Sequence, residues 1–254
     1  MELSLRPPLD SARLAEHGIE VLPATGSTNA EVADRARAGA PGWTVVVTEH
    51  QTAGRGRLDR TWDTPDRAAL TFSTLLRPEP PGGEWPWLPL LTGVAVAGAL
   101  QDVGVPATLK WPNDVLIDGR KTAGILAERL ETSSGPAALV GVGLNVHQRP
   151  DELPVSSATS IELATGAAPD RTELLLGILA RLRHQYDAWS AGGGIAVRPA
   201  YLDACRTVGQ EVRVAMPGGE ELVGPATDVD EEGRLVVAGR PVAAGDVVHV
   251  RPTG

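Results

Sequence analysis

The chain has 254 residues, 42% of them hydrophobic, which allows one large domain and a small one, each with a buried core. Its formal net charge of −9 argues against a general nucleic-acid-binding surface, which needs clustered basic residues. The single cysteine, Cys205, excludes a disulfide framework, and no apolar stretch is long enough to span a bilayer. We therefore expect a cytoplasmic protein that contacts neither nucleic acid nor membrane.

Helices and strands are predicted along the first 150 residues. A helix should begin at about Thr28, because Thr28 and Glu31 have capping-box spacing, and end near Gly39. β-Branched and apolar runs predict further elements at 43–49 (strand), 69–76 (strand), 88–103 (a largely buried helix) and 138–146 (strand).

A β-hairpin is predicted at Asp118-Gly119, a dipeptide that favours the tight turn between antiparallel strands. The hairpin would place Asp114 and Lys121 on adjacent strands. The preceding Trp111-Pro112 predicts an extended strand end, and Trp111 is best explained as a structural residue packed on the core.

The C-terminal third contains a long helix and then short strands. A capped helix should begin at Asp170, and the glycine run at 191–194 predicts a flexible break after it. From Thr207 onward, short alternating runs broken by glycine are typical of a small β-barrel. Cys205 precedes these runs and is expected to be a small buried hydrophobic residue.

The most informative segment is the arginine loop, residues 51–62, which carries Arg55, Arg57 and Arg60 in an acidic protein. Guanidinium groups offer bidentate hydrogen bonds that suit phosphate or carboxylate oxygens. Gly54 and Gly56 would allow positive φ and bring backbone N–H groups close to a ligand. The loop predicts an anion site; the alternative, a solvated basic turn, remains strongest for Arg60.

Five segments occur in the order and approximate spacing of one known family. They are Ser27-Thr28-Asn29, the Gln51-x-x-Gly-Arg-Gly-Arg57 loop, Lys110-Trp-Pro-Asn-Asp114, Arg120-Lys-x-x-Gly-Ile-Leu126 and Gly141-Val-Gly-Leu-Asn145. Together they resemble biotin protein ligase. The resemblance implies an α+β catalytic domain at 1–204, a class II synthetase-like fold whose mixed, mainly antiparallel sheet is flanked by helices. It also implies a small SH3-like β-barrel at 205–254.

The resemblance further implies a biotin–[acetyl-CoA-carboxylase] ligase that uses biotin, ATP and Mg²⁺. Such an enzyme makes biotinyl-5′-AMP, releases pyrophosphate and transfers biotin to a lysine of a biotin carboxyl carrier domain. Because biotin and ATP are both anions, cations and N–H groups must offset their repulsion. Only 26 residues precede Ser27, so we expect the monofunctional type without an N-terminal DNA-binding domain, as a monomer or weak dimer.

By resemblance, specific residues take roles in this chemistry. The catalytic set is Arg57, Lys110, Asp114 and Lys121, and Asp114 is also the candidate metal ligand, mainly through phosphate and water. The biotin-binding set is Ser27, Thr28, Asn29, Gln51, Gly54, Arg55, Gly56, Arg57, Lys121, Gly124 and Gly143. The ATP- or adenylate-binding set is Arg55, Arg57, Arg60, Trp62, Lys110, Asn113 and Asn145. Arg57 would also retain the adenylate, and Trp62 could stack on adenine.

Other interpretations remain open at this point. Thr28 could serve as a helix cap while also facing the ligand. The chain could be a lipoate-type ligase of the same fold, or a non-catalytic sensor of biotin or nucleotide. The family's usual loop continues differently, and Leu58-Asp59 here should make the loop slightly stiffer and less positive.

Overall fold

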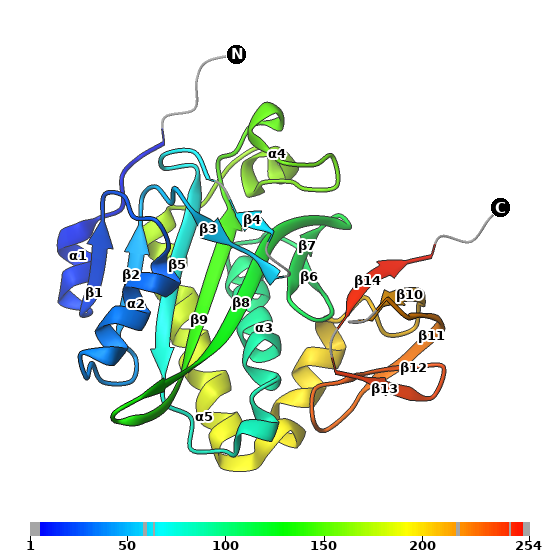
Figure 1. Ribbon diagram of the computed structural model, residues 1–254. Coiled ribbons are helices and arrows are strands. Elements are labelled where there is room, and N and C mark those ends of the chain that lie inside the picture. Colours follow the sequence, from blue (N-terminus) through cyan, green and yellow to red (C-terminus); the bar gives the residue numbers. More distant parts are fainter. Residues whose placement is uncertain (1–5, 58–59, 63, 217–218, 244, 251–254) are drawn as a thin grey trace.

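The computed structural model describes residues 6–57, 60–62, 64–216, 219–243 and 245–250. At its centre is a seven-stranded sheet in the order β1-β2-β5-β9-β8-β7-β6 (Figure 1). The strands are β1 Ile19–Leu22, β2 Val45–Thr48, β5 Ala69–Leu76, β6 Ala107–Lys110, β7 Asp114–Ile117, β8 Arg120–Thr132 and β9 Gly135–Asn145. In this sheet β1 and β2 are parallel and the other pairs antiparallel, which confirms the predicted mixed, mainly antiparallel sheet.

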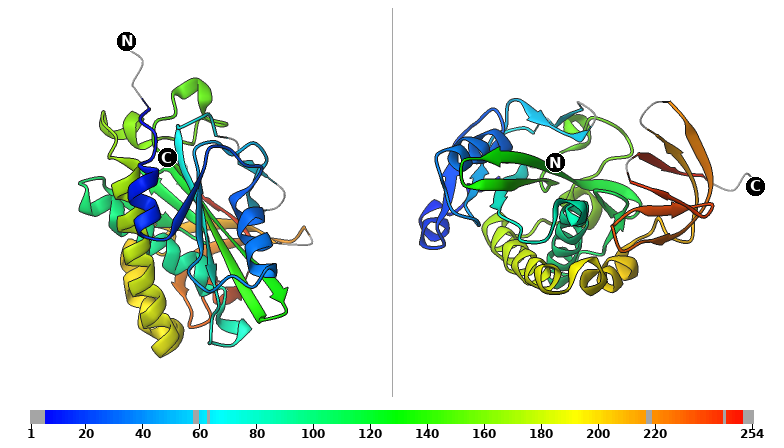
Figure 2. Two further views of the ribbon diagram at one scale, coloured as in Figure 1. Left: turned by 90° about the vertical axis from the view of Figure 1, so that its left-hand side faces the viewer. Right: turned by 60° about the horizontal axis from the view of Figure 1, so that its bottom comes forward.

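Helices cover both faces of the sheet (Figure 2). They are α1 Ser11–Glu16, α2 Thr28–Arg37, α3 Trp87–Asp102, α4 Ile161–Thr165 and α5 Arg171–Ala204. α2 packs on one face, over β5 and β9, whereas α3 lies between the other face and α5. α3 is apolar on nearly all of its faces, which is typical of a helix that is buried on both sides.

The hairpin between β7 and β8 forms as the Asp118-Gly119 dipeptide predicts. Asp118 and Gly119 both have positive φ, 49° and 72°, the conformation that a two-residue turn between twisted strands needs. Asp114 lies opposite Lys110 on β6, and the same carboxylate forms an ion pair with Lys121 on β8. The hairpin therefore brings three predicted site residues together.

The break predicted at 191–194 is present as a kink between two helical stretches of α5. It lies inside α5, where only Gly193 leaves helical geometry (φ 64°, ψ −163°) and kinks the helix. A Cβ on Gly194 would lie 2.1 Å from Trp87 Nε1 and 2.2 Å from the Glu231 carbonyl oxygen, so this glycine permits close packing. Within the described ranges, no helix combines the length and apolarity needed to cross a membrane.

A second, five-stranded antiparallel sheet, the C-terminal sheet, lies beside the end of α5 (Figure 1). Its order is β13-β12-β11-β10-β14, with strands β10 Glu211–Ala215, β11 Glu221–Val229, β12 Leu235–Val237, β13 Arg240–Val242 and β14 Asp246–His249. Two buried tryptophans attach it to the main body. Trp87 Nε1 donates to the Glu231 carbonyl at 2.6 Å, and Trp111 Nε1 donates to the Gly233 carbonyl at 3.1 Å. The structural role predicted for Trp111 is confirmed, and Cys205 is buried as expected.

Candidate active site

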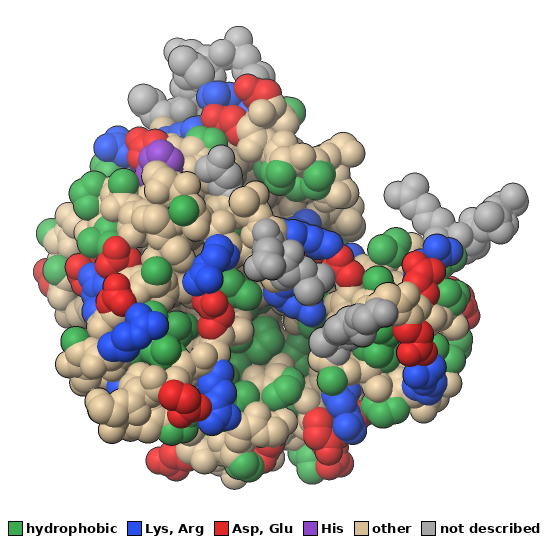
Figure 3. Space-filling model, viewed as in Figure 1, with side chains coloured by type: hydrophobic (Ala, Val, Ile, Leu, Met, Phe, Trp, Pro, Cys, Tyr) green, Lys and Arg blue, Asp and Glu red, His purple; other side chains and the backbone are tan. Residues whose placement is uncertain are grey.

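A cavity of about 1010 Å³ opens over β8 and β9, within the size range of sites that enclose small ligands. Its walls come from the start of α2, the arginine loop, strands β6–β9, residues 151–158 and Asp246 of the C-terminal sheet. Basic side chains gather on the face of the molecule between the two sheets (Figure 3). Among the predicted site residues, those that line the cavity are Ser27, Thr28, Asn29, Gln51, Arg55, Gly56, Arg57, Arg60, Trp62, Lys110, Asn113, Asp114, Lys121, Gly124, Gly143 and Asn145.

We define the polar end as the cavity-lining residues Thr28, Asn29 and Gln51 together with Ser73, a fully buried residue that contacts two of them. Gln51 Oε1 accepts from Thr28 N at 2.9 Å and from Thr28 Oγ1 at 3.3 Å. The Ser73 hydroxyl lies 2.7 Å from Thr28 Oγ1 and 2.6 Å from Asn29 Oδ1. These four buried side chains are held by one another, and the paired Oε1 fixes which way the Gln51 amide faces.

The predicted capping role of Thr28 is wrong. Ser27 occupies the N-cap position of α2 without a side-chain cap bond, and Thr28 is the first helical residue. Its hydroxyl instead bonds within the polar end, to Gln51 just after β2 and to Ser73 on β5. Glu31, the other half of the expected capping box, accepts from Thr25 Oγ1 and Arg35.

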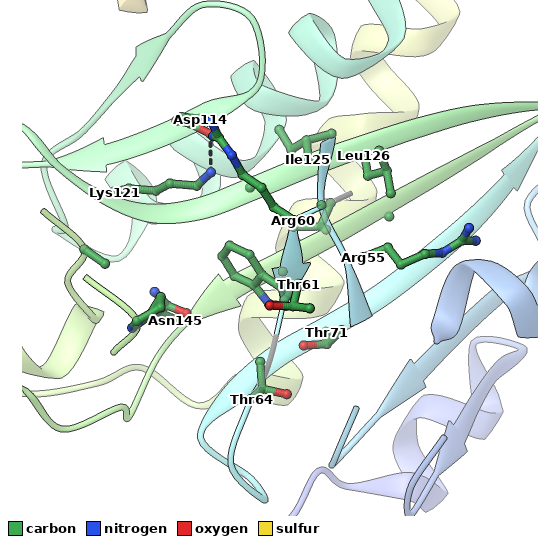
Figure 4. Close-up of a pocket in the computed structure, with 18 of the residues that line it drawn as sticks. Arg55, Arg60, Thr61, Thr64, Thr71, Asp114, Lys121, Ile125, Leu126 and Asn145 are labelled. Carbon is green, nitrogen blue, oxygen red and sulfur yellow. Dashed lines mark ion pairs between the residues drawn. The ribbon is translucent and has the colours of Figure 1, made fainter. Parts of the chain in front are cut away.

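The arginine loop is a small hairpin of β3 (Gly54–Arg55) and β4 (Thr61–Trp62). Its first arginine does not face the Asp114–Lys121 ion pair on β7 and β8: Figure 4 shows Arg55 directed away from Lys121 and towards α2. Arg55 Nη2 lies 3.5 Å from Glu128, whose other oxygen accepts from Asn29 Nδ2 at 2.6 Å. Arg55 is therefore partly neutralised by Glu128, a residue that no sequence motif singled out.

The other two arginines face the C-terminal sheet. Arg57 donates to Asn113 Oδ1 at 3.1 Å and to the Gly245 carbonyl at 3.4 Å, and Arg60 forms an ion pair with Asp246. Burial lowers the pKa of Arg57 from its usual value, and the nearby carboxylates Asp246 and Asp114 oppose that shift. Leu58 and Asp59, for which a stiffer, less positive loop was predicted, lie outside the described residues.

Lys121 and Asp114 form a close ion pair in the site, with Nζ 2.5 Å from the carboxylate (Figure 4). Lys110 enters from the neighbouring strand, directly opposite Asp114 in the sheet. We refer to Arg57, Arg60, Lys110 and Lys121 together as the cationic end of the cavity. Two of these four cations, Arg60 and Lys121, already form ion pairs with carboxylates of the chain itself, so an anionic ligand must compete for them.

Trp62 lies over the glycines that were predicted to leave room for a ligand. A Cβ on Gly143 would lie 2.3 Å from the indole ring, and one on Gly124 would lie 3.2 Å from it. Lys121 Nζ is 5.7 Å from the ring centroid, within cation–π range. In this conformation the Trp62 side chain fills the space over Gly124 and Gly143 that was predicted for the biotin chain.

The loop glycines serve close packing rather than unusual backbone angles. Neither Gly54 nor Gly56 has positive φ, contrary to the prediction. A Cβ on Gly54 would lie 2.1 Å from Gln51 Nε2 and 2.2 Å from the Trp62 carbonyl oxygen, whereas one on Gly56 would meet its nearest atom at 3.4 Å. Gly54 lies directly against Gln51 rather than lining the cavity, and it is required there because no side chain fits.

The two predicted asparagines hold other parts of the site in place. Asn113 accepts from Arg57 and donates to the Ile125 carbonyl at 2.9 Å. Asn145 donates to the Thr159 carbonyl at 3.0 Å and accepts from Gln148 at 2.8 Å. Both side chains have protein partners on both functional groups, which makes them positioning residues in this conformation.

The described residues do not by themselves make up a magnesium site. Within the described ranges, no three His, Cys, Asp or Glu side chains are grouped so as to hold a metal ion. Asp114 beside the cations of the cavity still fits Mg²⁺, because that ion commonly binds through one or two carboxylates together with substrate phosphates and water.

Several residues of the site carried no signal in the sequence. Ser73 lies in the middle of a buried strand, Glu128 on β8, and Asp246 is 186 residues from its partner Arg60. Residues 151–158, which form one wall, have no recognisable motif. A hydroxyl within an apolar strand was the one available hint, since a buried polar group needs a partner.

Two family descriptions match the chain. "Biotin/lipoate A/B protein ligase family" matches residues 21–145, and "Biotin protein ligase C terminal domain" matches residues 207–250. Together with the sheet and the cavity, these matches define the class: a biotin- or lipoate-type ligase fold followed by a biotin ligase C-terminal domain.

Individual relatives narrow the class further. "Biotin--[acetyl-CoA-carboxylase] ligase" of Mycobacterium tuberculosis is 41% identical over 97% of this chain and 98% of its own length. "Bifunctional ligase/repressor BirA" of Bacillus subtilis is 33% identical, over 93% of this chain and 74% of its own length. A solved structure, "Biotin protein ligase from Aquifex aeolicus in complex with biotin and ATP", superposes with a TM-score of 0.77 at 29% identity, covering 92% of this chain and 99% of that one. The chain belongs to the biotin protein ligase family.

Proposed function

We propose that this chain is a biotin–[acetyl-CoA-carboxylase] ligase. It would activate biotin with ATP to biotinyl-5′-AMP and then transfer biotin to a lysine of a biotin carboxyl carrier domain. The observation that carries the proposal is one cavity that joins an uncharged polar end to a cationic end. Relatives with this activity in their names cover nearly the whole chain and support it.

Biotin recognition is assigned to the polar end. The ureido ring is neutral, with two N–H donors and one carbonyl acceptor, and its burial requires matched partners at both edges. Thr28 and Gln51 supply a hydroxyl and an amide whose orientations are fixed by Ser73 and by the backbone of α2. The valeryl chain would run over Gly124 and Gly143, so Trp62 has to leave that space when biotin binds.

Adenylation is assigned to the cationic end. A biotin carboxylate oxygen forms a bond to the α-phosphorus of ATP, the bond from that phosphorus to the bridging oxygen breaks, and pyrophosphate leaves with its electrons. Lys121, Arg57 and Lys110 would offset the repulsion between the two anions and the charge that develops on the phosphates. Asn113 and the Gly245 carbonyl hold the Arg57 guanidinium in the cavity for that role.

Asp114 is the residue we assign to Mg²⁺, which when bound neutralises phosphate charge. The same carboxylate pairs with Lys121, so binding of the nucleotide would redistribute these charges. In the transfer step the acceptor lysine must lose a proton before its amine attacks the acyl carbon and AMP leaves. Asp114 and the released phosphate oxygens are the nearby groups that can accept that proton.

The remaining assignments complete the proposal. We place the catalytic domain at residues 1–204 and the C-terminal domain at 205–254, which the end of α5 at Ala204 supports. The partner is the carrier domain of acetyl-CoA carboxylase or a related carboxylase. We infer a cytoplasmic location from the single buried cysteine and the use of ATP.

A transfer assay tests the proposed function. The purified chain is incubated with labelled biotin, ATP, Mg²⁺ and a biotin carboxyl carrier domain, and a carrier with its acceptor lysine replaced serves as the control. Label on the normal carrier alone is the expected result. Biotin binding without transfer would identify a sensor, and transfer of lipoate in place of biotin would identify a lipoate-type ligase.

A further inference from the structure

One wall of the cavity, the wall segment, is formed by residues 149–158 between β9 and α4. Its C-terminal end is joined to the site itself. Lys121 N donates to the Ser157 carbonyl at 2.9 Å, and Thr159 N donates to the Lys121 carbonyl at 2.8 Å. Lys121 belongs to the cationic end, so these two backbone hydrogen bonds connect the wall segment directly to a residue that we assign to phosphate binding.

The N-terminal end of the wall segment is held by a carboxylate, Glu152. Its oxygens accept from Arg149 N at 2.9 Å and from Arg149 Nη2 at 2.8 Å, bonds that stay within the segment. Glu152 also forms an ion pair with Arg6, which lies at the start of the described chain. Arg6 Nη2 donates in addition to the His147 carbonyl at 3.1 Å, just before the segment.

This ion pair differs from the surface pairs of the molecule in its burial. The side chains of Arg6 and Glu152 are 17% and 13% exposed. Charge-assisted hydrogen bonds are stronger in such surroundings than at an open surface, and a carboxylate that loses a partner there must attract water instead. Loss of Arg6 would therefore loosen the N-terminal end of the wall segment.

We propose that Arg6 is a positioning residue of the active site, which fixes the wall segment through Glu152 and the His147 carbonyl without touching substrate. The inference rests on the proposed function, because a displaced wall segment is expected to weaken the binding of ATP. The wall joins the site at Lys121, whereas Arg55 lies towards α2 on the other side of the cavity (Figure 4). The apparent KM for ATP should therefore respond more than that for biotin.

The chain offers a matched control for a purely structural role. Arg13 also ties the N-terminal part of the chain to the body, through a hydrogen bond of 3.0 Å to Glu173 on α5. That pair is about half exposed and its residues do not line the cavity. Arg13→Ala thus weakens the attachment of the N-terminal part without affecting the wall.

The test compares Arg6→Ala, Arg6→Lys, Glu152→Gln and Arg13→Ala in the full chain. We expect Arg6→Ala and Glu152→Gln to raise the KM for ATP about five- to tenfold, where tenfold corresponds to ~1.4 kcal/mol, with kcat within about twofold. Arg6→Lys should recover most of the loss, and Arg13→Ala should match the wild type. Hydrogen exchange of amides 147–158 should accelerate in Arg6→Ala and not in Arg13→Ala.

The two proposals can fail separately. If the wild type transfers biotin but Arg6→Ala equals Arg13→Ala in both KM and exchange, the positioning role is wrong. If the wild type transfers nothing, the proposed function fails, and the exchange experiment still decides whether Arg6 holds the wall segment. Should Arg6→Ala fail to fold, Arg6→Lys and Glu152→Gln carry the comparison.

Discussion

The two ends of the cavity differ in how far their side chains are already arranged to meet a ligand. At the polar end, Gln51, Thr28, Ser73 and Asn29 are buried and bonded to one another by neutral hydrogen bonds. At the cationic end, charged side chains are paired with carboxylates of the chain itself, as in Lys121–Asp114 and Arg60–Asp246. The biotin ring would thus meet a preformed set of partners, whereas the phosphates must displace existing ones.

This difference assigns distinct costs to the two substrates. A preformed polar site loses little freedom when its ligand binds, so its affinity depends on exact placement of a few groups. When a ligand replaces ion pairs within the protein, its binding free energy is only the difference between the new contacts and the ion pairs that are lost. Salt screens these charges and reduces that difference. Replacements at the polar end should therefore raise the KM for biotin, and replacements at the cationic end should lower kcat.

The largest effect is expected for Lys121→Ala. It removes a cation from the place where charge develops and leaves Asp114 without its 2.5 Å partner, so adenylation should slow on the order of 10²- to 10³-fold. Pyrophosphate release measures this step directly. Lys121→Arg, which keeps the charge, should retain more activity; equal losses in both variants would show that charge is not what Lys121 supplies.

Next in size is the difference between Gly54→Ala and Gly56→Ala. The new methyl group at position 54 would meet Gln51 Nε2 at 2.1 Å and displace the amide that the polar end depends on. At position 56 the nearest atom is 3.4 Å away. We expect the KM for biotin to rise at least about tenfold for Gly54→Ala, which corresponds to the loss of one or more hydrogen bonds between neutral groups. For Gly56→Ala we expect the KM for biotin to change little. Biotin titration by calorimetry provides the check, and similar affinities for the two variants would contradict the packing argument.

These two positions also show what the sequence could and could not predict. Local signals were sufficient for the Asp118-Gly119 turn and the strand at 69–76, whereas the convergence of Arg57, Lys121 and Asp114 in one cavity was predicted from the resemblance to biotin protein ligase. The reason for Gly54 was predicted wrongly, because a close contact with Gln51 cannot be distinguished from a positive φ until the fold is known.

Site residues that contact partners far away in the sequence could not be predicted from the sequence. Ser73, Glu128 and Asp246 reach the site from segments whose own patterns indicate only buried or surface strands. Trp62 was expected near the ligand and lines the cavity, yet its place over Gly143 depends on how the loop hairpin folds back. The break at 191–194 was predicted from its glycines, but the packing partner of Gly194, Trp87, lies far away in sequence and was not.

A smaller effect is expected from Ser73→Ala, with Thr74→Val as its control. Ser73 orients Thr28 and Asn29, so loss of one neutral hydrogen bond should raise the KM for biotin about three- to tenfold and leave the KM for ATP unchanged. Thr74 is the next residue on the same strand, faces the opposite side, and its buried hydroxyl has no hydrogen-bond partner among the described residues. If Thr74→Val impaired biotin binding equally, the effect would belong to the strand rather than to the Ser73 hydroxyl.

The smallest effect concerns pH. Burial and the neighbouring Lys110 lower the pKa of His249. The folded state thus resists protonation, so the contribution of His249 to stability is present above the unfolded pKa of about 6.5 and is lost as pH falls through the lower folded pKa. Thermal unfolding below and above this window should show a smaller acid destabilisation in His249→Gln than in the wild type. His184→Gln, a replacement at an exposed position, serves as the control, and an unchanged profile for His249→Gln would refute the assignment.

The central claim is that one cavity holds biotin and ATP together so that its cations allow the two anions to react. Single-turnover mass spectrometry of the wild type with both substrates and no carrier tests this directly. We predict close to one biotinyl-5′-AMP per chain, formed together with one pyrophosphate and retained by the protein. Binding of both substrates without formation of the adenylate would contradict the account.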